Sequence, residues 1–408
     1  MTGDYGRIRA LFDLASDLPE EERSSFLQRE CVNDPNMRLR VERLLAADGE
    51  RIDIIGHDIR RSIDGDIDER FGEYRLIKCV GHGGMGDVWL AEQDPPLQRL
   101  VAIKVIKPGL DTRQVIARFE LERQTLAKLG HPGIAQVFDA GATASGRPYF
   151  VMEFVDGLSI ADYCDQHCLN IRERLQLFRT VCDAVSHAHR KAIIHRDLKP
   201  ANILVVEENG RPFPKIIDFG IAKATSEHTR NVTALTMVGH AAGTPAYMSP
   251  EQHNPGGGDA VDTRTDVFGL GVVLYELLTG QLPYTAEATA DSYRGSSSER
   301  FIRPSTAIAR TKDRASLAAA RRTDISKLAS SLSGDLDCIL RKALEFEMDR
   351  RYDSIDSFSR DIDNHLCARP IAARPPSWTY VAMRFMRRHR LAVAASALLL
   401  VSVAIGLG

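Results

Sequence analysis

Three glycines near residue 80 have a spacing that could support chemistry. Gly81, Gly83 and Gly86 lie in the run GHGGMGDV at residues 81–88, where missing side chains would let backbone N–H groups approach phosphate oxygens closely. A glycine-rich hairpin would explain the run about as well. A dinucleotide-binding loop would need a helix after it, whereas VWL at residues 88–90 predicts a strand.

A lysine follows in an apolar segment. Lys104 ends the run VAIK at residues 101–104, and its neighbours predict a buried strand. A lone buried charge is costly, so this position calls for an acidic partner or a polyphosphate. A surface lysine is the alternative, and the apolar neighbours argue against it.

The most specific signal is the run HRDLKPAN at residues 195–202, followed by DFG at 218–220 and SPE at 249–251. Taken in order with the glycine run and the strand lysine, this set resembles the eukaryotic-type protein kinases. It is most similar to the bacterial Ser/Thr kinases of that family, over residues 74–366.

The resemblance implies roles in phosphoryl transfer from ATP, whose transition state needs positioning and cations. Lys104 would hold the α- and β-phosphates, with Glu122 as its ion-pair partner and Glu120 as the rival for that role. Asp197 would accept or orient the proton of the substrate hydroxyl, and Lys199 would neutralise the γ-phosphate.

Two residues are implied as ligands of Mg²⁺, because Asn202 and Asp218 offer the hard oxygens that this ion prefers. The implied nucleotide site adds Met152 at the back of the pocket and the backbone of Glu153 and Val155, which would bond the base. Its apolar and glycine positions are Val80, Gly81, Gly83, Gly86, Val88, Ala102 and Leu204. Core packing is a serious alternative for Val88, Ala102 and Leu204.

The acceptor is implied by Lys199 and by GTPAY at residues 243–247, which resemble Ser/Thr rather than Tyr kinases. The polar stretch between Gly220 and Gly243 holds five hydroxyls that autophosphorylation could use, and a phosphate there could pair with Arg196. Thr236 is the leading candidate and Thr233 the next; the others are Thr225, Ser226 and Thr229. An ordinary mobile loop is the alternative.

Other positions are expected to be structural. Glu251 and Arg351 resemble a buried ion pair, and Asp266 resembles the aspartate that supports the catalytic-loop backbone. The stretch 293–333, rich in Ser, Arg and Ala, predicts a surface insertion. The Cys and His residues at 164–168 lack a second ligand pair at zinc spacing, so we assign no structural metal.

Regular elements must position these residues. The pattern predicts a strand, turn and strand over 74–92, a strand over 100–106 and a helix over 111–129. A capping box at Asn170 begins a helix with one apolar face. A strand-rich part followed by a helix-rich part indicates an α+β fold of two lobes, a small β-rich lobe and a larger helical one.

The composition is that of an ordinary globular protein. The chain has 408 residues, a formal net charge of -2 and 44% hydrophobic residues, so no global basic surface favours a nucleic-acid partner. Seven scattered cysteines do not suggest a disulfide framework.

The two ends predict further organisation. Residues 1–49 read as a helical segment and 50–73 as a linker. Residues 367–390 are basic, and the uncharged run 391–408 is long enough for a single-pass membrane anchor. The end of the chain inside this run suggests that it is truncated there. Arginines before the run place the kinase domain in the cytoplasm.

Two other functional classes are alternatives to a protein kinase. A pseudokinase scaffold would keep the fold without catalysis, but Lys104, Glu122, Asp197, Asn202 and Asp218 are all present. A small-molecule kinase is disfavoured by the long threonine-bearing loop. The expected partners are proteins with Ser or Thr hydroxyls, the membrane and, for trans-autophosphorylation, a second copy of the chain.

Overall fold

The computed structural model describes residues 70–82, 86–96, 98–106, 129–143, 146–219, 245–253, 261–284, 301–311, 313–375 and 377–389. Several predicted features lie outside these ranges: Gly83, the rival acids Glu120 and Glu122, the loop threonines, and the segments 1–49 and 391–408. The chain divides into two compact units, Met1–Lys78 with Glu92–Leu97, and Cys79–Ala91 with Gln98–Gly408.

The first unit contains a short antiparallel pairing. Strand β1 (Arg70–Phe71) pairs with the start of β2 (Tyr74–His82), with Phe71 opposite Tyr74, and both aromatic rings are buried. An ion pair of 2.6 Å joins Arg70 to Asp94. Arg70 and Phe71 fall within the linker predicted over 50–73, and the structure corrects that prediction at its end. A two-residue strand is too short to show alternation in the sequence.

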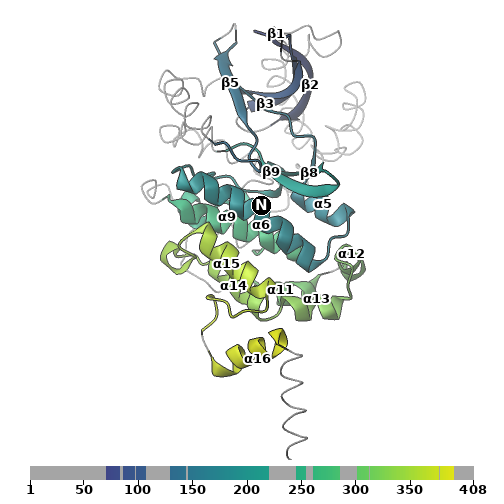
Figure 1. Ribbon diagram of the computed structural model, residues 1–408, viewed down its shortest axis with the longest axis vertical. Helices are drawn as coiled ribbons and strands as arrows, with labels where there is room; N and C mark the ends of the chain where they lie inside the picture. Colours follow the sequence, from purple (N-terminus) through teal and green to yellow (C-terminus); the bar gives the residue numbers. More distant parts are fainter. Residues whose placement is uncertain are drawn as a thin grey trace, which may run out of the picture. The chain divides into compact units, whose positions relative to one another are not determined.

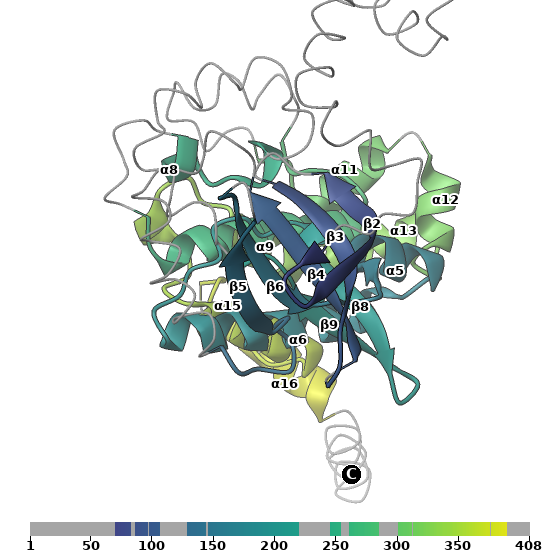
Figure 2. The ribbon, with the colours of Figure 1, turned by 90° about the horizontal axis from the view of Figure 1, so that it is seen from above.

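The second unit begins with a sheet that contains the rest of β2, β3 (Gly86–Gln93) as far as Ala91, β4 (Arg99–Ile106), β5 (Val137–Ala142) and β6 (Pro148–Glu153). Its strand order is β2-β3-β4-β6-β5, as Figure 2 shows from above. In the antiparallel pair of β4 and β6, Lys104 lies opposite Phe150. The two strands predicted within 74–92 and the strand predicted over 100–106 are confirmed. Residues 83–85, where the turn was predicted, lie outside the described ranges.

The helical part is built around two long helices, α6 (Ile171–Arg190) and α9 (Thr263–Thr279), which pack on each other and on α15 (Ile355–Leu366). The predicted capping box is present at α6: the Asn170 side chain accepts from the Glu173 N–H, and the Glu173 carboxylate accepts from the Asn170 N–H. Helix α9 is buried along almost its whole length, so it forms the centre of this part (Figure 1).

Shorter elements complete the described chain. A second sheet has the order β7-β8-β9, from Leu158–Ser159, Ile203–Glu208 and Arg211–Ile216. The short helices are α5 (Ile160–Gln166), α8 (Pro250–His253), α11 (Pro304–Arg310), α12 (Arg314–Ala319), α13 (Ile325–Leu332), α14 (Asp335–Ala343) and α16 (Trp378–Arg388). Single 3₁₀ turns lie at η1 (Pro200–Asn202), η2 (Pro245–Tyr247) and η5 (Met348–Arg350).

The expected surface insertion at 293–333 is wrong for its described part. Helices α11 to α13 bury Ile308, Leu328 and Leu332 completely in the core. Arg321 is only 1% exposed, because its guanidinium donates to the carbonyls of Leu277 and Leu278 at the end of α9. Those carbonyls lack partners inside the helix, so a buried arginine satisfies them.

Within the ranges that the structure describes, no helix has both the length and the apolar character needed to cross a membrane. The run 391–408, which the sequence predicted to be an anchor, lies outside those ranges.

Candidate active site

A buried carboxylate on α9 fixes the loop that carries the HRD run. The two oxygens of Asp266 accept from the backbone N–H groups of His195 and Arg196, each at 2.8 Å, and from Nε2 of His189 at 2.7 Å. Burial acts to raise the pKa of Asp266, but these hydrogen bonds outweigh it and the pKa lies below its usual value. The predicted support by Asp266 is confirmed, whereas sequence reasoning did not single out His189 as a partner of Asp266.

His195 links this loop to the segment after β9. The side chain is fully buried, with Nε2 3.1 Å from the Ile217 carbonyl and Nδ1 3.2 Å from the Asp197 N–H. The ring therefore donates from Nε2 and accepts at Nδ1, as a neutral imidazole. Burial lowers the pKa of His195 despite the nearby carboxylates, which favours the same neutral form.

The Asp197 carboxylate has two polar neighbours from its own loop. Lys199 Nζ donates to Asp197 Oδ2 at 3.1 Å, and Asn202 Nδ2 lies 3.2 Å from the same oxygen and 2.8 Å from the Asp197 carbonyl. Asn202 thus uses its amide nitrogen to shape the loop, and its amide oxygen is the atom that it can offer to a cation. The three residues predicted here are brought together.

Lys104 and Asp218 meet from different motifs. Their Nζ and Oδ2 atoms are 2.9 Å apart, and Lys104 is 8% exposed on β4. The predicted burial of this lysine is confirmed, and in the described chain its acidic neighbour is Asp218. Asp218 also has φ of 60°, a conformation that non-glycine residues rarely adopt and that occurs preferentially at functional sites.

A backbone hydrogen bond places the loop that carries Asp197 beside the segment that carries Asp218. The N–H of Ile217 donates to the carbonyl of Asn202 at 2.9 Å, so the residue before Asp218 is bonded to the loop that carries Asp197. The lysine of the strand, the aspartate and asparagine of the HRDLKPAN run and the aspartate of DFG therefore form one site.

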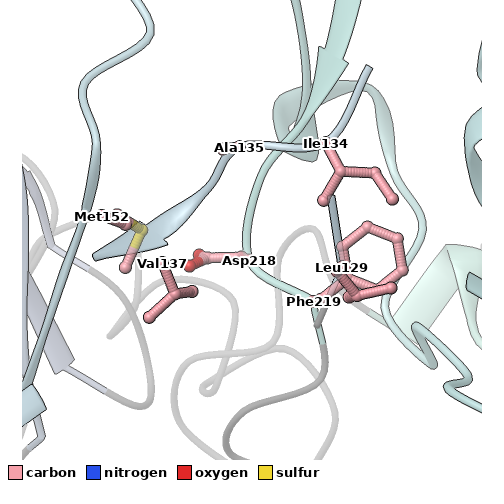
Figure 3. Close-up of a pocket in the computed structure, with 7 residues that line it drawn as sticks. All are labelled: Leu129, Ile134, Ala135, Val137, Met152, Asp218 and Phe219. Atoms are coloured by element: carbon pink, nitrogen blue, oxygen red, sulfur yellow. The ribbon is translucent and has the colours of Figure 1, made fainter. Parts of the chain in front are cut away.

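Met152 lies on β6 next to this site. It lines a cavity about the size of one water molecule, together with Val137 and Asp218. Figure 3 shows the Asp218 carboxylate directed toward Val137 and Met152, while Phe219 packs with Leu129 and Ile134.

The other residues predicted for the nucleotide site differ in their contacts and in their burial. The Glu153 N–H donates to the Gln136 carbonyl at 2.8 Å. The backbone group that Glu153 can offer to a nucleotide base is therefore its carbonyl. The Glu153 side chain accepts from Lys215 at 2.6 Å. Ala102 and Val155 are buried, Gly81, Val88 and Leu204 are partly buried, and Val80 is 44% exposed.

Gly86 has a structural requirement that the motif alone did not indicate. A Cβ atom at this position would lie 2.2 Å from the Val105 carbonyl oxygen of β4, so no side chain fits there. The glycine allows the backbones of β3 and β4 to approach each other at the base of the glycine run.

The predicted pairing of Glu251 and Arg351 is confirmed. Arg351 donates two parallel hydrogen bonds of 2.8 Å to the Glu251 carboxylate, which also accepts from the Thr265 hydroxyl at 2.7 Å. The next residue, Gln252, donates to the Arg196 carbonyl at 2.7 Å. The sequence did not single out Gln252, although its place after the SPE run was a usable signal.

The oxygen ligands available at this site suit a divalent ion that is bound together with a polyphosphate. Asn202 and Asp218 supply two hard oxygens, and Mg²⁺ usually takes its other ligands from phosphates and water. Among the described residues, no three or more His, Cys, Asp or Glu side chains form a metal-binding group by themselves.

A family model described as the protein kinase domain matches residues 74–359. The serine/threonine-protein kinase Pkn1 of Myxococcus xanthus is 41% identical over 54% of this chain and 31% of its own length. The serine/threonine-protein kinase PknB of Mycobacterium tuberculosis is 36% identical over 71% of this chain and 42% of its own length. The chain thus spans less than half of these relatives.

A solved structure shares the fold. The kinase domain of Mycobacterium tuberculosis PknI covers 73% of this chain and 98% of its own, with a TM-score of 0.51 and 24% identity.

Proposed function

Since this chain belongs to the protein kinase family, we propose that it is a serine/threonine kinase that transfers the γ-phosphoryl group of ATP to hydroxyls of proteins. The observation that carries the proposal is the meeting of residues from separate motifs. Asp197 lies with Lys199 and Asn202, and the adjoining segment brings Asp218 to Lys104.

The residues have distinct tasks in this reaction. Asp197 orients the substrate hydroxyl and accepts its proton, and Lys199 places a positive charge next to that carboxylate. Lys104 presents a buried cation to the phosphates, where low solvent exposure strengthens its attraction. Asn202 and Asp218 would hold Mg²⁺, which supplies positive charge to the phosphate oxygens when bound.

Preorganisation of the loop is part of the mechanism. Asp266 fixes the N–H groups before Asp197, and neutral His195 fixes the N–H of Asp197 itself. The loop that carries Asp197 therefore needs little reorganisation when the phosphoryl group is transferred.

The test is incubation of the full chain with labelled ATP, Mg²⁺ and a protein acceptor, followed by mapping of the phosphorylated residues. The parent protein should label Ser or Thr, and Asp197→Asn should lower turnover by at least about 10³-fold with the fold retained. ATP binding without transfer by the parent would support the pseudokinase scaffold, and transfer to metabolites alone would support a small-molecule kinase.

Membrane attachment is the second part of the proposal. The uncharged run 391–408 would insert as a single-pass helix, with residues 1–390 in the cytoplasm. Within them, 1–49 would be a helical segment, the residues from 50 to the start of β1 at Arg70 a linker, and 367–390 a basic juxtamembrane segment. What supports it is the length of the run and the arginines that precede it. Pelleting with membranes after a high-salt wash would support insertion, and release by salt would overturn it.

A further inference from the structure

Helix α16 is docked on the helical part by a buried polar cluster. The Tyr380 ring is 6% exposed, and its hydroxyl donates to Asp335 Oδ1 at 3.2 Å while accepting from the Ile371 N–H at 3.2 Å. Arg384 forms an ion pair with the same Asp335, whose side chain is 2% exposed. One face of α16 is therefore fixed against Asp335 at the start of α14.

The segment that leads into α16 is also fixed. Asp361 on α15 is 1% exposed and accepts from the N–H groups of Ala372 and Ala373 at 2.8 Å or less. Ile371 beside them is 4% exposed. Contacts of Tyr380 and Arg384 and contacts of the segment before α16 thus both fix the orientation of this helix on the helical part.

The opposite face of α16 is apolar and open to solvent. Trp378 is 94% exposed, Phe385 53%, Met386 50% and Val381 42%. At about 100° per residue these four side chains fall within an arc of roughly 140°, on the side away from Tyr380 and Arg384. A helix that is apolar on its outer face indicates an interaction surface.

The charge around this face is positive. Residues 367–390 contain six arginines and no acidic residue, and Arg388 is exposed at the edge of the apolar arc. Anionic lipid headgroups would complement this charge.

We propose that α16 lies flat in the surface of an anionic bilayer, with Trp378, Val381, Phe385 and Met386 among the headgroups and upper acyl chains. The inference rests on the proposed membrane attachment, because α16 ends at Arg388, only two residues before the uncharged run 391–408. Since α16 is docked through Asp335, it holds the helical part of the kinase against the membrane in one orientation.

The two tryptophans of the chain make the proposal testable. Trp89 is 8% exposed and Trp378 is 94% exposed, so Trp89→Phe leaves Trp378 as the single emitter. The full chain is reconstituted in vesicles of phosphatidylcholine with anionic phosphatidylglycerol, with and without lipids brominated near the headgroup. Brominated lipid should reduce Trp378 emission by about twofold or more, and iodide in the aqueous phase should have little effect.

Controls separate the apolar face from general effects. Phe385→Ser with Met386→Ser should restore quenching of Trp378 by iodide. Leu100→Ser, at a residue that is 51% exposed on β4, should leave both quenching patterns unchanged. If the Trp89→Phe protein loses activity, the parent protein serves instead, because buried Trp89 contributes a constant background.

The outcomes distinguish this inference from the proposed anchor. Vesicle flotation in high salt with bromolipid quenching supports both. Flotation with Trp378 quenched by iodide alone keeps the anchor and overturns the surface helix. Shielding of Trp378 from both quenchers indicates a second copy or a protein partner on this face and also overturns it. Absence of flotation together with iodide quenching overturns the anchor and the surface helix alike.

Discussion

The pairing of Arg351 with Glu251 should make a large polar contribution to the stability of the helical part. The Arg351 side chain is fully buried and that of Glu251 is 9% exposed. Arg351 also donates to the carbonyls of Glu345, Phe346 and Arg264. Arg351→Met would leave a buried carboxylate and three carbonyls without this donor, which should cost about 3–5 kcal/mol in the free energy of unfolding.

A double-mutant cycle isolates the pair. Glu251→Gln keeps an oxygen for Arg351 and should cost about 1–3 kcal/mol. The double variant should cost about 2 kcal/mol less than the sum of the singles, because neither partner is then left as an unpaired buried charge. Arg350→Met is the matched control: Arg350 pairs with Glu347 at the surface, so the change should be within about 0.5 kcal/mol.

The pH dependence gives a second check. Burial acts to raise the pKa of Glu251, but the bonds from Arg351 and Thr265 hold it below its ordinary value of 4.5. In the parent, the stabilisation from Glu251 is therefore complete above pH 4.5 and lost as the pH falls through the folded-state pKa. In Arg351→Met burial would dominate and raise that pKa, so the variant's deficit should shrink between pH 7 and about pH 5.

Urea unfolding of the full chain in a mild detergent, followed by circular dichroism at both pH values, measures these differences. The reasoning would be refuted if Arg351→Met lowered the free energy of unfolding no more than Arg350→Met does. It would also be refuted if the effects of the two single variants on this free energy were strictly additive in the double variant.

Three further outcomes are expected. Gly86→Ala should lower the thermal midpoint and cost about 1–3 kcal/mol because its Cβ would overlap a β4 carbonyl, whereas Gly130→Ala, with no atom within 4 Å, should change little; equal melting curves would contradict this. Asp266→Asn should lower kcat by about 10²-fold with a smaller effect on KM for ATP, since it misplaces the catalytic loop; an unchanged kcat would argue against that positioning role. Active protein should carry phosphate on Thr236 or Thr233 by mass spectrometry, and unchanged activity of the double alanine variant would count against activation there.

Much of the site could be predicted from the sequence because its signals are local. Lys104 sits in an apolar run, and that run predicted a buried strand. Asn170 and Glu173 are three residues apart, so the capping box that begins α6 could be recognised without any tertiary information. Asp197, Lys199 and Asn202 lie within six residues, and their mutual contacts follow from one loop.

The supporting contacts were decided by the tertiary structure. His189 and Gln252 are distant in sequence from the groups that they contact, and nothing around either residue marks Asp266 or the Arg196 carbonyl as its partner. Such contacts depend on which helices pack together, and that choice is made by the whole core.

Buried arginines show most clearly what could not be predicted from the sequence. Arg321 lies in the stretch 293–333, whose Ser, Arg and Ala content and poor apolar spacing predict a surface insertion. A charged side chain is also rarely buried. The fold buries Arg321 where the carbonyls at the end of α9 need donors, and Arg384 is likewise held by a buried aspartate. Sequence alone determined which residues could carry the chemistry and which local elements hold them. Only the tertiary structure decided which charges are buried, because burying a charge is affordable only where the fold supplies its partners.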